Sequence, residues 1–579
     1  MKPLRSAVLA IAAITALAGC QQGRSEGARR TSGQREQARR ADDSPAGSSS
    51  NSGLDLQEGP GGQRPLTNQE ALIPPQCYTR TEGRFNPCYV CHQDPIEGDD
   101  HENRMGDGSL QGKYQFSDFA TKNRWRNLFT DRSQAVSRLS DEAILSYVTT
   151  DNYTPLMERM RGDSRFKGWK PDLQGLQDAA QAFDRRGFAK DGSGWVAFNY
   201  MPMPSTFWPT NGATDDVMIR LPAEFRSKVT GGAAVDDVYL ANLAIAEAAI
   251  KNMTDVTTAA IDERKVGGDL NGDGKLGVVR TIKRPLKYVG AASEVDVHTF
   301  LYPRGTEFLH TVRYLGVDGE GRVHVPRRMK EVRYMVKHKI IPKFAIAGLY
   351  DNEVQEKIEG NPPYYADFRD RGIDNGFGWR VQGYIEGADG ELRPNKYEET
   401  LFCMGCHSTI GSTIDKTFAF ARKVDGAPGW GYVNLRGMPD APARGDSDGQ
   451  ILTYLRRVGG GSEFRANEEM QRRWFRPDGT VDEAKVKAAR DVYEILAPSR
   501  ERALLLNKAY RVIVMEQSFL LGRDPTIAPP QNVFAQIDRE VPPLAPEHRF
   551  RWDIRVDWAA AGRSAQRMNA VVARRTAQE

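Results

Sequence analysis

Cysteine and histidine are both scarce in this chain, with six and eight copies among 579 residues. Charge is nearly balanced, at 80 basic and 76 acidic residues, so the composition indicates neither a nucleic-acid partner nor another strongly charged partner. Beyond the N-terminus, no apolar run approaches the ~20 residues that a membrane-spanning helix needs. A Ser/His/Asp pattern, a phosphate-binding loop and a nucleotide-binding signature are also missing, so the motifs support no activity of those classes.

The scarce cysteines and histidines form two copies of the pattern Cys-x-x-Cys-His. With this composition a chance match is expected in only about one chain in a thousand. Two thiols three positions apart can add across the vinyl groups of one haem, and the adjacent His then coordinates the iron. A zinc site would need two further Cys or His ligands nearby, and none surrounds the second copy. The pattern predicts two covalent haem c groups, held by Cys88, Cys91, His92, Cys403, Cys406 and His407.

The N-terminus combines a charged start with a short apolar stretch. Lys2 and Arg5 come first, and residues 7–17 are apolar but too few to span a bilayer. The sequence Leu-Ala-Gly-Cys then ends at Cys20 and resembles the lipobox of bacterial lipoproteins; an ordinary signal peptide that places Cys after small residues is the alternative. The resemblance implies a lipoprotein signal peptide at 1–19, and a diacylglycerol thioether and a further acyl chain such as palmitate on Cys20.

The residues after the lipobox predict where the protein works and how it is held. Gln21 stands where Asp would imply inner-membrane retention in the lipoprotein family, so the resemblance implies a lipid anchor in the outer membrane, facing the periplasm or the cell surface. Residues 20–65 have almost no large apolar side chains and are predicted to be a disordered tether reaching roughly 35–40 Å. Haem attachment to Cys-x-x-Cys-His also takes place outside the cytoplasm, so the two signals agree.

Cys77 is the one cysteine that neither the lipobox nor the haem motifs use. An unpaired cysteine in an oxidising compartment has three interpretations: a buried inert thiol, a haem ligand, or an intermolecular disulfide. The buried thiol is preferred, because free cysteine behaves as a small hydrophobe.

The region after the second motif has a characteristic order of features. A Gly-Met-Pro sequence around Met438 follows His407, and a helix with one apolar face is predicted at 450–458. This order resembles class I cytochromes c, in which a Met-Pro loop over the haem precedes a closing amphipathic helix. The resemblance implies that His407 is the proximal and Met438 the distal iron ligand of a haem module at 401–460. A thioether ligand raises the haem potential and leaves no site for a substrate.

The first motif is followed by a similar helix, predicted at 139–148. Ser140 suits its N-cap, and two acidic residues follow in the first turn. This helix is interpreted as the closing helix of a first haem module at 66–150.

The distal ligand of the first haem is left open by the sequence, because no Met-Pro loop lies between the motif and that helix. His101 is preferred for its proximity to His92, and Met105 lies in the same turn-rich segment. The sequence Met-Pro-Met-Pro, with Met201 and Met203, could reach in from the next region. An iron with no distal ligand is the remaining alternative, and it separates enzymes from electron carriers.

Residues 151–400 are predicted to form a mixed, partly β domain. One strong helix is expected at 235–252, and β-branched and aromatic residues indicate strands elsewhere. The expected strands lie at 195–200, 294–302 and 306–317, the last turning through 318–321 into a hairpin. Histidines in this region are interpreted as structural or surface residues that stay candidates for an outer-shell role: His298, His310, His324 and His338.

A possible calcium loop lies within this middle region. Asp269, Asn271 and Asp273 supply oxygen ligands at positions 1, 3 and 5, which resembles the start of an EF-hand loop. Position 12 is Arg280 rather than the bidentate Glu, so a distant carboxylate would have to complete a structural site. A plain turn is the alternative.

The C-terminal region, 461–579, is predicted to be helical. A capping box at Thr480 and Glu483 begins one helix, and a second is expected at 501–521. The expected fold is therefore multidomain α+β, with two mainly helical cytochrome c-like modules flanking a mixed, partly β middle region.

Two functions compete at this point. A membrane-anchored dihaem c-type cytochrome would transfer electrons outside the cytoplasm between redox protein partners. The layout is also similar to dihaem peroxidases and oxygenases, which implies a haem-dependent oxidoreductase with one reactive, open haem as the alternative. The size of the region between the motifs favours this second function, whereas the Met-Pro loop favours the first.

Overall fold

The structure is a computed structural model that describes residues 66–81, 83–92, 116, 118, 120–205, 207–409, 413–462, 467–537 and 544–562. These residues all lie in one compact unit, Glu58–Glu579. Cys20, the predicted signal peptide and tether, and His101 and Met105 lie outside the described residues.

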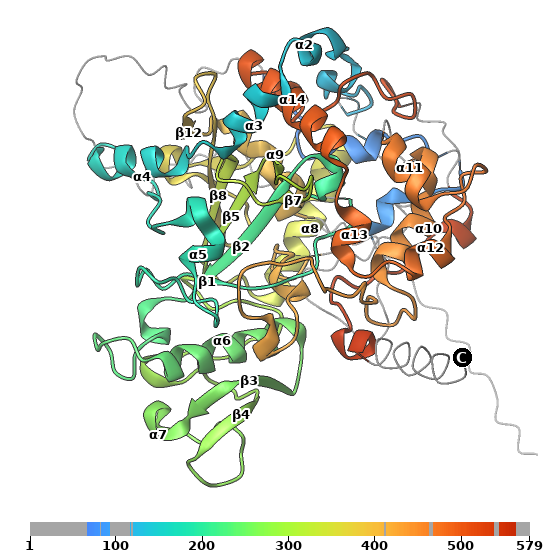
Figure 1. Ribbon diagram of the computed structural model, residues 1–579. Helices are drawn as coiled ribbons and strands as arrows, with labels where there is room; N and C mark the ends of the chain where they lie inside the picture. The colour runs from blue at the N-terminus through green and yellow to red at the C-terminus, as the bar shows by residue number, and fades with distance from the viewer. Residues whose placement is uncertain are drawn as a thin grey trace, which may run out of the picture. The chain divides into compact units, whose positions relative to one another are not determined.

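A large antiparallel sheet occupies the middle of this unit (Figure 1). Seven of its strands follow one another in the spatial order β1, β2, β5, β8, β11, β10, β9, and β12 pairs with β11 outside that path. The strands are β1 (Val196–Ala197), β2 (Thr214–Arg220), β5 (Glu307–Arg313), β8 (Met329–Lys337), β9 (Ala366–Asp367), β10 (Ile373–Asp374), β11 (Trp379–Glu386) and β12 (Leu392–Pro394).

The prediction of two mainly helical cytochrome modules flanking a middle region is wrong. The sheet is the centre of the described structure, and segments from both halves of the chain pack against it. The physical reason is visible in α3 (Asp141–Thr149) and α10 (Gln450–Ser462), the helices expected to close each haem module. The apolar face of each helix packs on a segment that lies far away in the sequence.

The helix α10 packs against the first haem motif instead of the second. Arg457, in α10, accepts a hydrogen bond from the Asn86 amide through its carbonyl, at 3.0 Å. The ring of Tyr454 lies 6.3 Å from that of Tyr89, inside the first motif. In Figure 1 the blue turns of the first motif accordingly lie beside the orange α10. Gly459, at φ +61°, breaks the helix where the ring of Phe85 leaves no room for a side chain.

The helix α3 begins as predicted, because the Ser140 hydroxyl accepts a hydrogen bond from the Ala143 amide at 3.1 Å. Its buried face, Ile144 and Val148, packs against α14 (Arg500–Glu516) and the sheet rather than near the first motif. Apolar periodicity fixes which side of a helix is buried, but it does not name the partner.

Helix predictions in the middle and C-terminal regions were largely confirmed. The helix expected at 235–252 is α6 (Asp236–Lys251), and the one expected at 501–521 is α14, capped by Ser499. The capping-box prediction was wrong, because the hydroxyl of Thr480 donates a hydrogen bond to the Asp478 carboxylate. Two short helices form instead of one. They are α12 (Glu483–Lys487), with Asp482 as its N-cap, and α13 (Val492–Leu496), with Asp491 as its N-cap. The other helices are α2 (Ser133–Ser137), α4 (Tyr153–Gly162), α5 (Ala179–Ala182), α7 (Glu263–Val266), α8 (Lys343–Ile358), α9 (Tyr397–His407) and α11 (Glu468–Trp474).

Two smaller hairpins complete the strands. The hairpin predicted around 318–321 joins β6 (Gly316–Val317) and β7 (Val323–His324), and a second joins β3 (Asp255–Asp262) and β4 (Val278–Lys283). The stretch 294–302 forms no strand, so that prediction was wrong. Phe300 has a left-handed backbone there, at φ +65°, which a strand does not tolerate.

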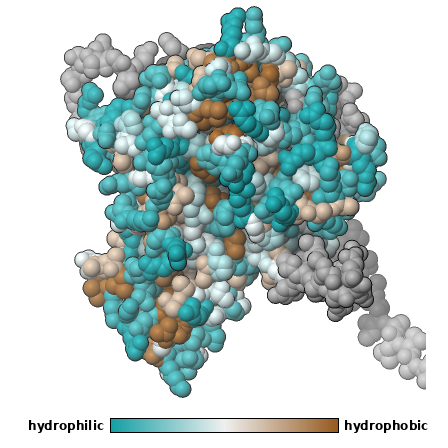
Figure 2. Space-filling view, in the orientation of Figure 1, coloured by the Kyte–Doolittle hydropathy of each residue, from teal (hydrophilic) through white to brown (hydrophobic). Residues whose placement is uncertain are grey.

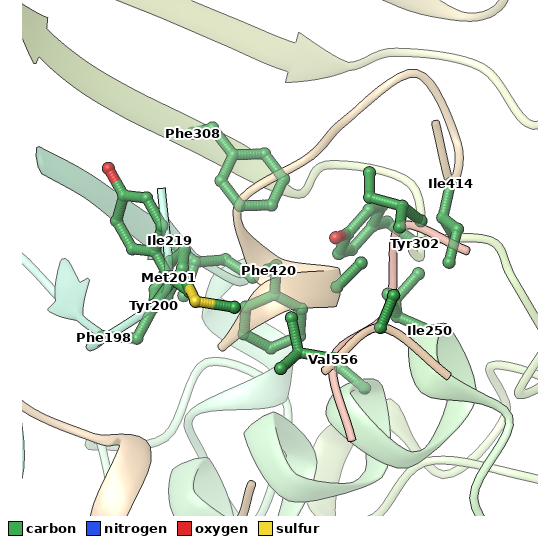
Figure 3. Packing of buried hydrophobic residues seen from close by; sticks show 14 of the residues in the cluster. Phe198, Tyr200, Met201, Ile219, Ile250, Tyr302, Phe308, Ile414, Phe420 and Val556 are labelled. Carbon is green, nitrogen blue, oxygen red and sulfur yellow. The ribbon is translucent and has the colours of Figure 1, made fainter. Parts of the chain in front are cut away.

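Aromatic side chains from distant segments form the core beside the sheet (Figure 3). The ring of Phe420 lies 5.2 Å from that of Phe198 and 5.9 Å from that of Tyr302. Tyr302 in turn lies edge-on to Phe308 of β5 at 5.2 Å. This packing fixes the loop on either side of Phe420, which carries part of the site described below.

The outer face drawn in Figure 2 is mainly polar, with apolar side chains over the β3–β4 hairpin. The large exposed hydrophobic residues of that part are Val229, Leu276, Val278 and Leu286. In the described part of the chain, no helix is both long and apolar enough to cross a membrane.

Candidate functional site

One cavity of about 360 Å³ is lined by residues from both Cys-x-x-Cys-His motifs. Cys91 of the first motif lies on its wall, together with Cys403, Cys406 and His407 of the second. This volume falls in the range of cofactor and ligand pockets, ~300–1,000 Å³. The tertiary structure thus brings together two motifs that stand far apart in the sequence.

The second motif occupies the last turn of α9. Glu399 fixes the start of this helix, since its carboxylate accepts hydrogen bonds from the Lys396 amide at 2.8 Å and from both Nη atoms of Arg393 at 2.7 and 2.8 Å. Helical spacing then places Cys403 and Cys406 one turn apart on the same side, facing the cavity. Two thiols on one helical face are what attachment to a single haem edge requires.

His407 is oriented for metal coordination. Its Nδ1 lies 2.7 Å from the backbone carbonyl of Lys416, which can only accept a hydrogen bond. Nδ1 therefore carries the proton, and the lone pair of Nε2 is left for a metal in the cavity. Burial lowers the pKa of His407 to about 4, and the charges of Arg333 and His310 act in the same direction. The imidazole is consequently neutral at pH 7, as a metal ligand must be.

A strained turn presents the carbonyl that orients His407. Asp415 and Lys416 both have left-handed backbones, at φ +47° and +62°, and the flanking Ile414 and Thr417 exchange two hydrogen bonds of 3.0 and 3.1 Å. Such backbone angles match a type I′ turn, which usually carries Asn or Gly.

Buried partners hold this turn in place. The Asp415 carboxylate accepts hydrogen bonds from the Tyr302 amide at 2.9 Å and from Trp379 Nε1 at 3.3 Å, and it pairs with Lys337. Strain at non-glycine residues is kept only where the surroundings over-determine it, and it concentrates at functional sites. The turn therefore serves to fix the position of the His407 ring.

The central sheet forms another wall of the cavity. Side chains alternate along a strand, so every second residue of β2, β5 and β8 faces the same side. Val217, His310 and Arg333 are neighbours across these three strands. The cavity-lining residues of the sheet are Asp215, Val217, Phe308, His310, Val312, Lys330, Glu331, Arg333, Tyr334, Met335 and Val381.

A buried ion network lies on this wall. The Glu331 carboxylate is 2.9 Å from Nε of Arg333 and 2.8 Å from Nη1 of Arg523. Burial alone would raise the pKa of Glu331, but the two guanidinium groups lower it to about 2. Arg523 also stacks over Phe402, at 4.8 Å, next to Cys403. The network gives the cavity a net positive wall beside the second motif, suited to the carboxylate groups of a haem.

His310 lies within this wall without a strong polar partner. Among the described residues, its Nε2 makes no hydrogen bond, and Oδ2 of Asp215 is 3.5 Å away. Asp215 accepts a hydrogen bond from the Tyr200 hydroxyl at 2.5 Å instead. The His310 ring stands edge-on to Phe207 at 5.2 Å, and Phe207 has a left-handed backbone, at φ +55°.

The first motif forms a single helical turn at Pro87–Val90, continued by Cys91 and His92. The amides of Cys91 and His92 both bond the carbonyl of Cys88, at 3.0 and 2.8 Å, so the motif is wound for haem attachment. His101 lies outside the described residues. Met203, one of the alternatives from the sequence, lines the same cavity as Cys91.

The second motif is in close backbone contact with the segment that precedes the first motif. A side chain at Gly405 would approach the carbonyl oxygen of Leu72 to 2.5 Å, so only glycine fits.

Met438 is not brought to this cavity. Its side chain is buried among apolar residues, and its backbone carbonyl accepts a hydrogen bond from the Val492 amide at 2.8 Å. Its ligation of the iron stays a prediction that this geometry does not support.

The predicted calcium loop is closed by its own hydrogen bonds. The Asp269 carboxylate accepts from the amides of Gly272 and Gly274 at 2.7 and 2.8 Å, and the Asn271 side chain donates to Asp273 at 3.0 Å. Within the described part of the chain, no group of three or more His, Cys, Asp or Glu residues could hold a metal ion. The loop geometry matches the turn alternative, and calcium binding stays a prediction.

The residues of the second motif fit a covalently held haem. Cys403 and Cys406 take part in no disulfide and face the cavity, and burial raises the pKa of both thiols, to about 11 for Cys406. Both thiols are free for thioether bonds, and His407 supplies the neutral nitrogen. Cys77 is half-buried in the turn Pro75–Tyr78 and is absent from the cavity wall.

Sequence reasoning missed the sheet wall of the site. His310 was interpreted as structural, and Glu331 and Arg333 drew no attention, because single polar residues on a strand carry no spacing signal. The one available signal was charge at alternate positions of a segment that is otherwise apolar, residues 329–337. Such residues face a buried side and need partners there.

Comparisons with known proteins place the chain in a family. A model of a lipoprotein family matches residues 63–493. An uncharacterized lipoprotein of Aquifex aeolicus (strain VF5) is 31% identical over 517 residues, covering 79% of this chain and 86% of that protein. No solved structure matches. The lipoprotein prediction is confirmed at this level: the chain belongs to this family of lipoproteins.

Proposed function

We propose that this lipoprotein is a c-type cytochrome with two covalent haem groups that transfers electrons outside the cytoplasm. The lipid on Cys20 would hold it in the outer membrane, facing the periplasm or the cell surface, where redox proteins are its partners. The observation that carries the proposal is the orientation of His407, whose Nδ1 is tied to the Lys416 carbonyl while its other ring nitrogen is left for iron.

The shared cavity supports electron transfer in particular. When bound, the haem groups would supply reversible one-electron chemistry at iron. The chain would attach one group at Cys88 and Cys91 and the other at Cys403 and Cys406; of these four, Cys91, Cys403 and Cys406 line the same cavity. Two groups in one cavity exchange electrons without a partner protein between them. The surrounding aromatic core excludes water, which stabilises a defined potential for each iron.

The test is a count of covalent haem by the pyridine haemochrome assay on protein that has passed denaturing electrophoresis. We expect two groups per chain in the wild type and one in the variant Cys403→Ala/Cys406→Ala, because each Cys pair forms the thioether bonds of one group. The variant Cys88→Ala/Cys91→Ala is the matched control for the first site. A wild-type count below two contradicts the proposal.

A second candidate function is a haem-dependent oxidoreductase with one reactive iron. The observation in its favour is the charged cavity wall of Glu331, Arg333 and Arg523, which is more polar than electron transfer alone requires. Turnover of hydrogen peroxide with a reducing dye separates the two functions. A carrier gives no saturable turnover, whereas an enzyme does.

A further inference from the structure

We propose that His310 is the second axial ligand of the iron held by His407, so that this haem is six-coordinate with two imidazole ligands. The inference rests on the proposed function. It gives His310 the distal position that the sequence analysis gave to Met438. Four observations on the cavity lead to it, and each concerns a different property of the residue.

The first observation is position. His310 lies in the middle strand of the three that form the cavity wall, directly across from Val217 on β2 and Arg333 on β8. The wall and the second motif line the same cavity, so His310 and His407 both border the space in which a haem would be held.

The second observation is proximity. His310, Arg333 and His407 all line the same cavity. Phe207 contacts both wall residues, with its ring 5.2 Å from that of His310 and 5.1 Å from the Arg333 guanidinium. The three side chains therefore form one packed patch that faces the second motif.

The third observation is an unused nitrogen. Nε2 of His310 is buried and has no hydrogen-bond partner among the described residues, and a buried polar atom of this kind costs about 1–3 kcal/mol. Coordination to iron would remove that cost. Asp215, 3.5 Å away, would then accept a hydrogen bond from the other ring nitrogen after a rotation of the imidazole, an arrangement that metal-ligating histidines commonly adopt.

The fourth observation concerns the competing ligands. Met438 is buried elsewhere in the core, as described above, and its side chain does not line the cavity. Met203 and Met335 do line it, and either would give a thioether ligand instead of a second imidazole. The two chemistries are distinguished by spectroscopy, because imidazole and thioether ligands give different near-infrared charge-transfer bands and thioether ligation raises the potential.

The experiment compares the full-length protein with His310→Ala and His310→Met, and with His338→Ala as a matched control. His338 also lies at the sheet and pairs with a carboxylate, Asp374, at 2.7 Å, but it does not line the cavity. The measurements are covalent haem count, near-infrared bands of the oxidised protein, and equivalents of carbon monoxide bound per reduced chain. The variant Cys88→Ala/Cys91→Ala assigns each signal to one haem.

We expect one bis-imidazole band in the wild type, assigned to the second haem. His310→Ala should remove it and raise carbon monoxide binding by one equivalent per chain, with two haems still attached. His310→Met should replace it with a thioether band and raise one potential, while His338→Ala changes nothing. If His310→Ala does not fold, the near-infrared bands of the wild type and of His310→Met test the assignment of His310 as a ligand.

Two results would overturn the inference. One is a thioether band for the second haem of the wild type, which assigns the ligand to Met203 or Met335. The other is an unchanged spectrum and carbon monoxide stoichiometry in His310→Ala with both haems attached. A wild-type haem count below two is a separate outcome, because it refutes the proposed function itself and is recorded before any ligand measurement.

Discussion

Replacing Glu331 by glutamine tests whether the buried ion network holds the cavity wall together. The Glu331 side chain is 3% exposed and pairs with Arg333 and Arg523, which come from the sheet and from a segment after α14. Glutamine keeps the shape of the side chain but removes its charge. The buried guanidinium groups of Arg333 and Arg523 would then lose their common carboxylate partner. Leaving buried charges without a partner lowers the free energy of unfolding by about 3–5 kcal/mol.

The pKa of Glu331 gives an independent magnitude for the same interaction. The folded protein lowers this pKa from 4.5 to about 2, so the folded state favours the ionised form. At ~1.36 kcal/mol per pH unit this corresponds to about 3 kcal/mol of stability. Because the folded pKa is depressed, the contribution is fully present above pH 4.5 and is lost as the pH falls toward 2. The two magnitudes agree.

The assay is urea denaturation followed by tryptophan fluorescence, at pH 7 and at pH 3. Glu331→Gln should lower the free energy of unfolding by about 3 kcal/mol at pH 7 and by less at pH 3, where the wild type has lost part of the same contribution. Glu320→Gln is the matched control: Glu320 pairs with Arg322 at 2.5 Å, but both side chains are more than half exposed, so a change within about 0.5 kcal/mol is expected. An effect of Glu331→Gln no larger than the control at pH 7 would refute the reasoning.

Two further predictions concern the lipid anchor and the packing of Gly405 against Leu72. Cys20→Ala should release the protein from membranes into the soluble fraction, and Gln21→Asp should move it from the outer to the inner membrane fraction; retention of Cys20→Ala on membranes would mean that another anchor exists. Gly405→Ala should destabilise the protein by about 1–3 kcal/mol and reduce attachment of the second haem, because its Cβ would meet the Leu72 carbonyl at 2.5 Å. Gly348→Ala in α8 has open space at its Cβ and should be neutral or slightly stabilising, so equal unfolding midpoints for the two glycine variants would contradict the packing argument.

Local signals in the sequence predicted local structure well. Ser140 caps α3 as its position before an acidic turn indicated, and α6 and α14 formed where apolar residues recur at helical spacing. Each of these depends on residues within a few positions of one another. The wrong predictions concern segments whose local sequence favours two conformations almost equally. Asp482 rather than Thr480 is the N-cap of its helix, and Phe300 has a left-handed backbone, because contacts with residues distant in the sequence favour these conformations.

The assignment of closing helices failed for the same reason on a larger scale. An apolar stripe on α10 fits any complementary surface, and the sequence order suggested the second motif. The surface that it packs against includes Tyr89 in the first motif, which lies far from α10 in the sequence. Resemblance to a small cytochrome supplied a local order of features but no knowledge of this sheet.

The sequence by itself predicted haem attachment and the lipid anchor, because Cys-x-x-Cys-His and the lipobox are each complete within five residues and need no tertiary contact to be recognised. Only the tertiary structure decided that residues of both motifs line one cavity, that the strained turn at Asp415 and Lys416 orients His407, and that His310 and Arg333 line the same cavity from neighbouring strands. Strand pairing sets these distances, since residues that are neighbours across β5 and β8 carry no common pattern in the chain. Coordination depends on such distances, and so the proposal of His310 as a ligand could come only from the fold.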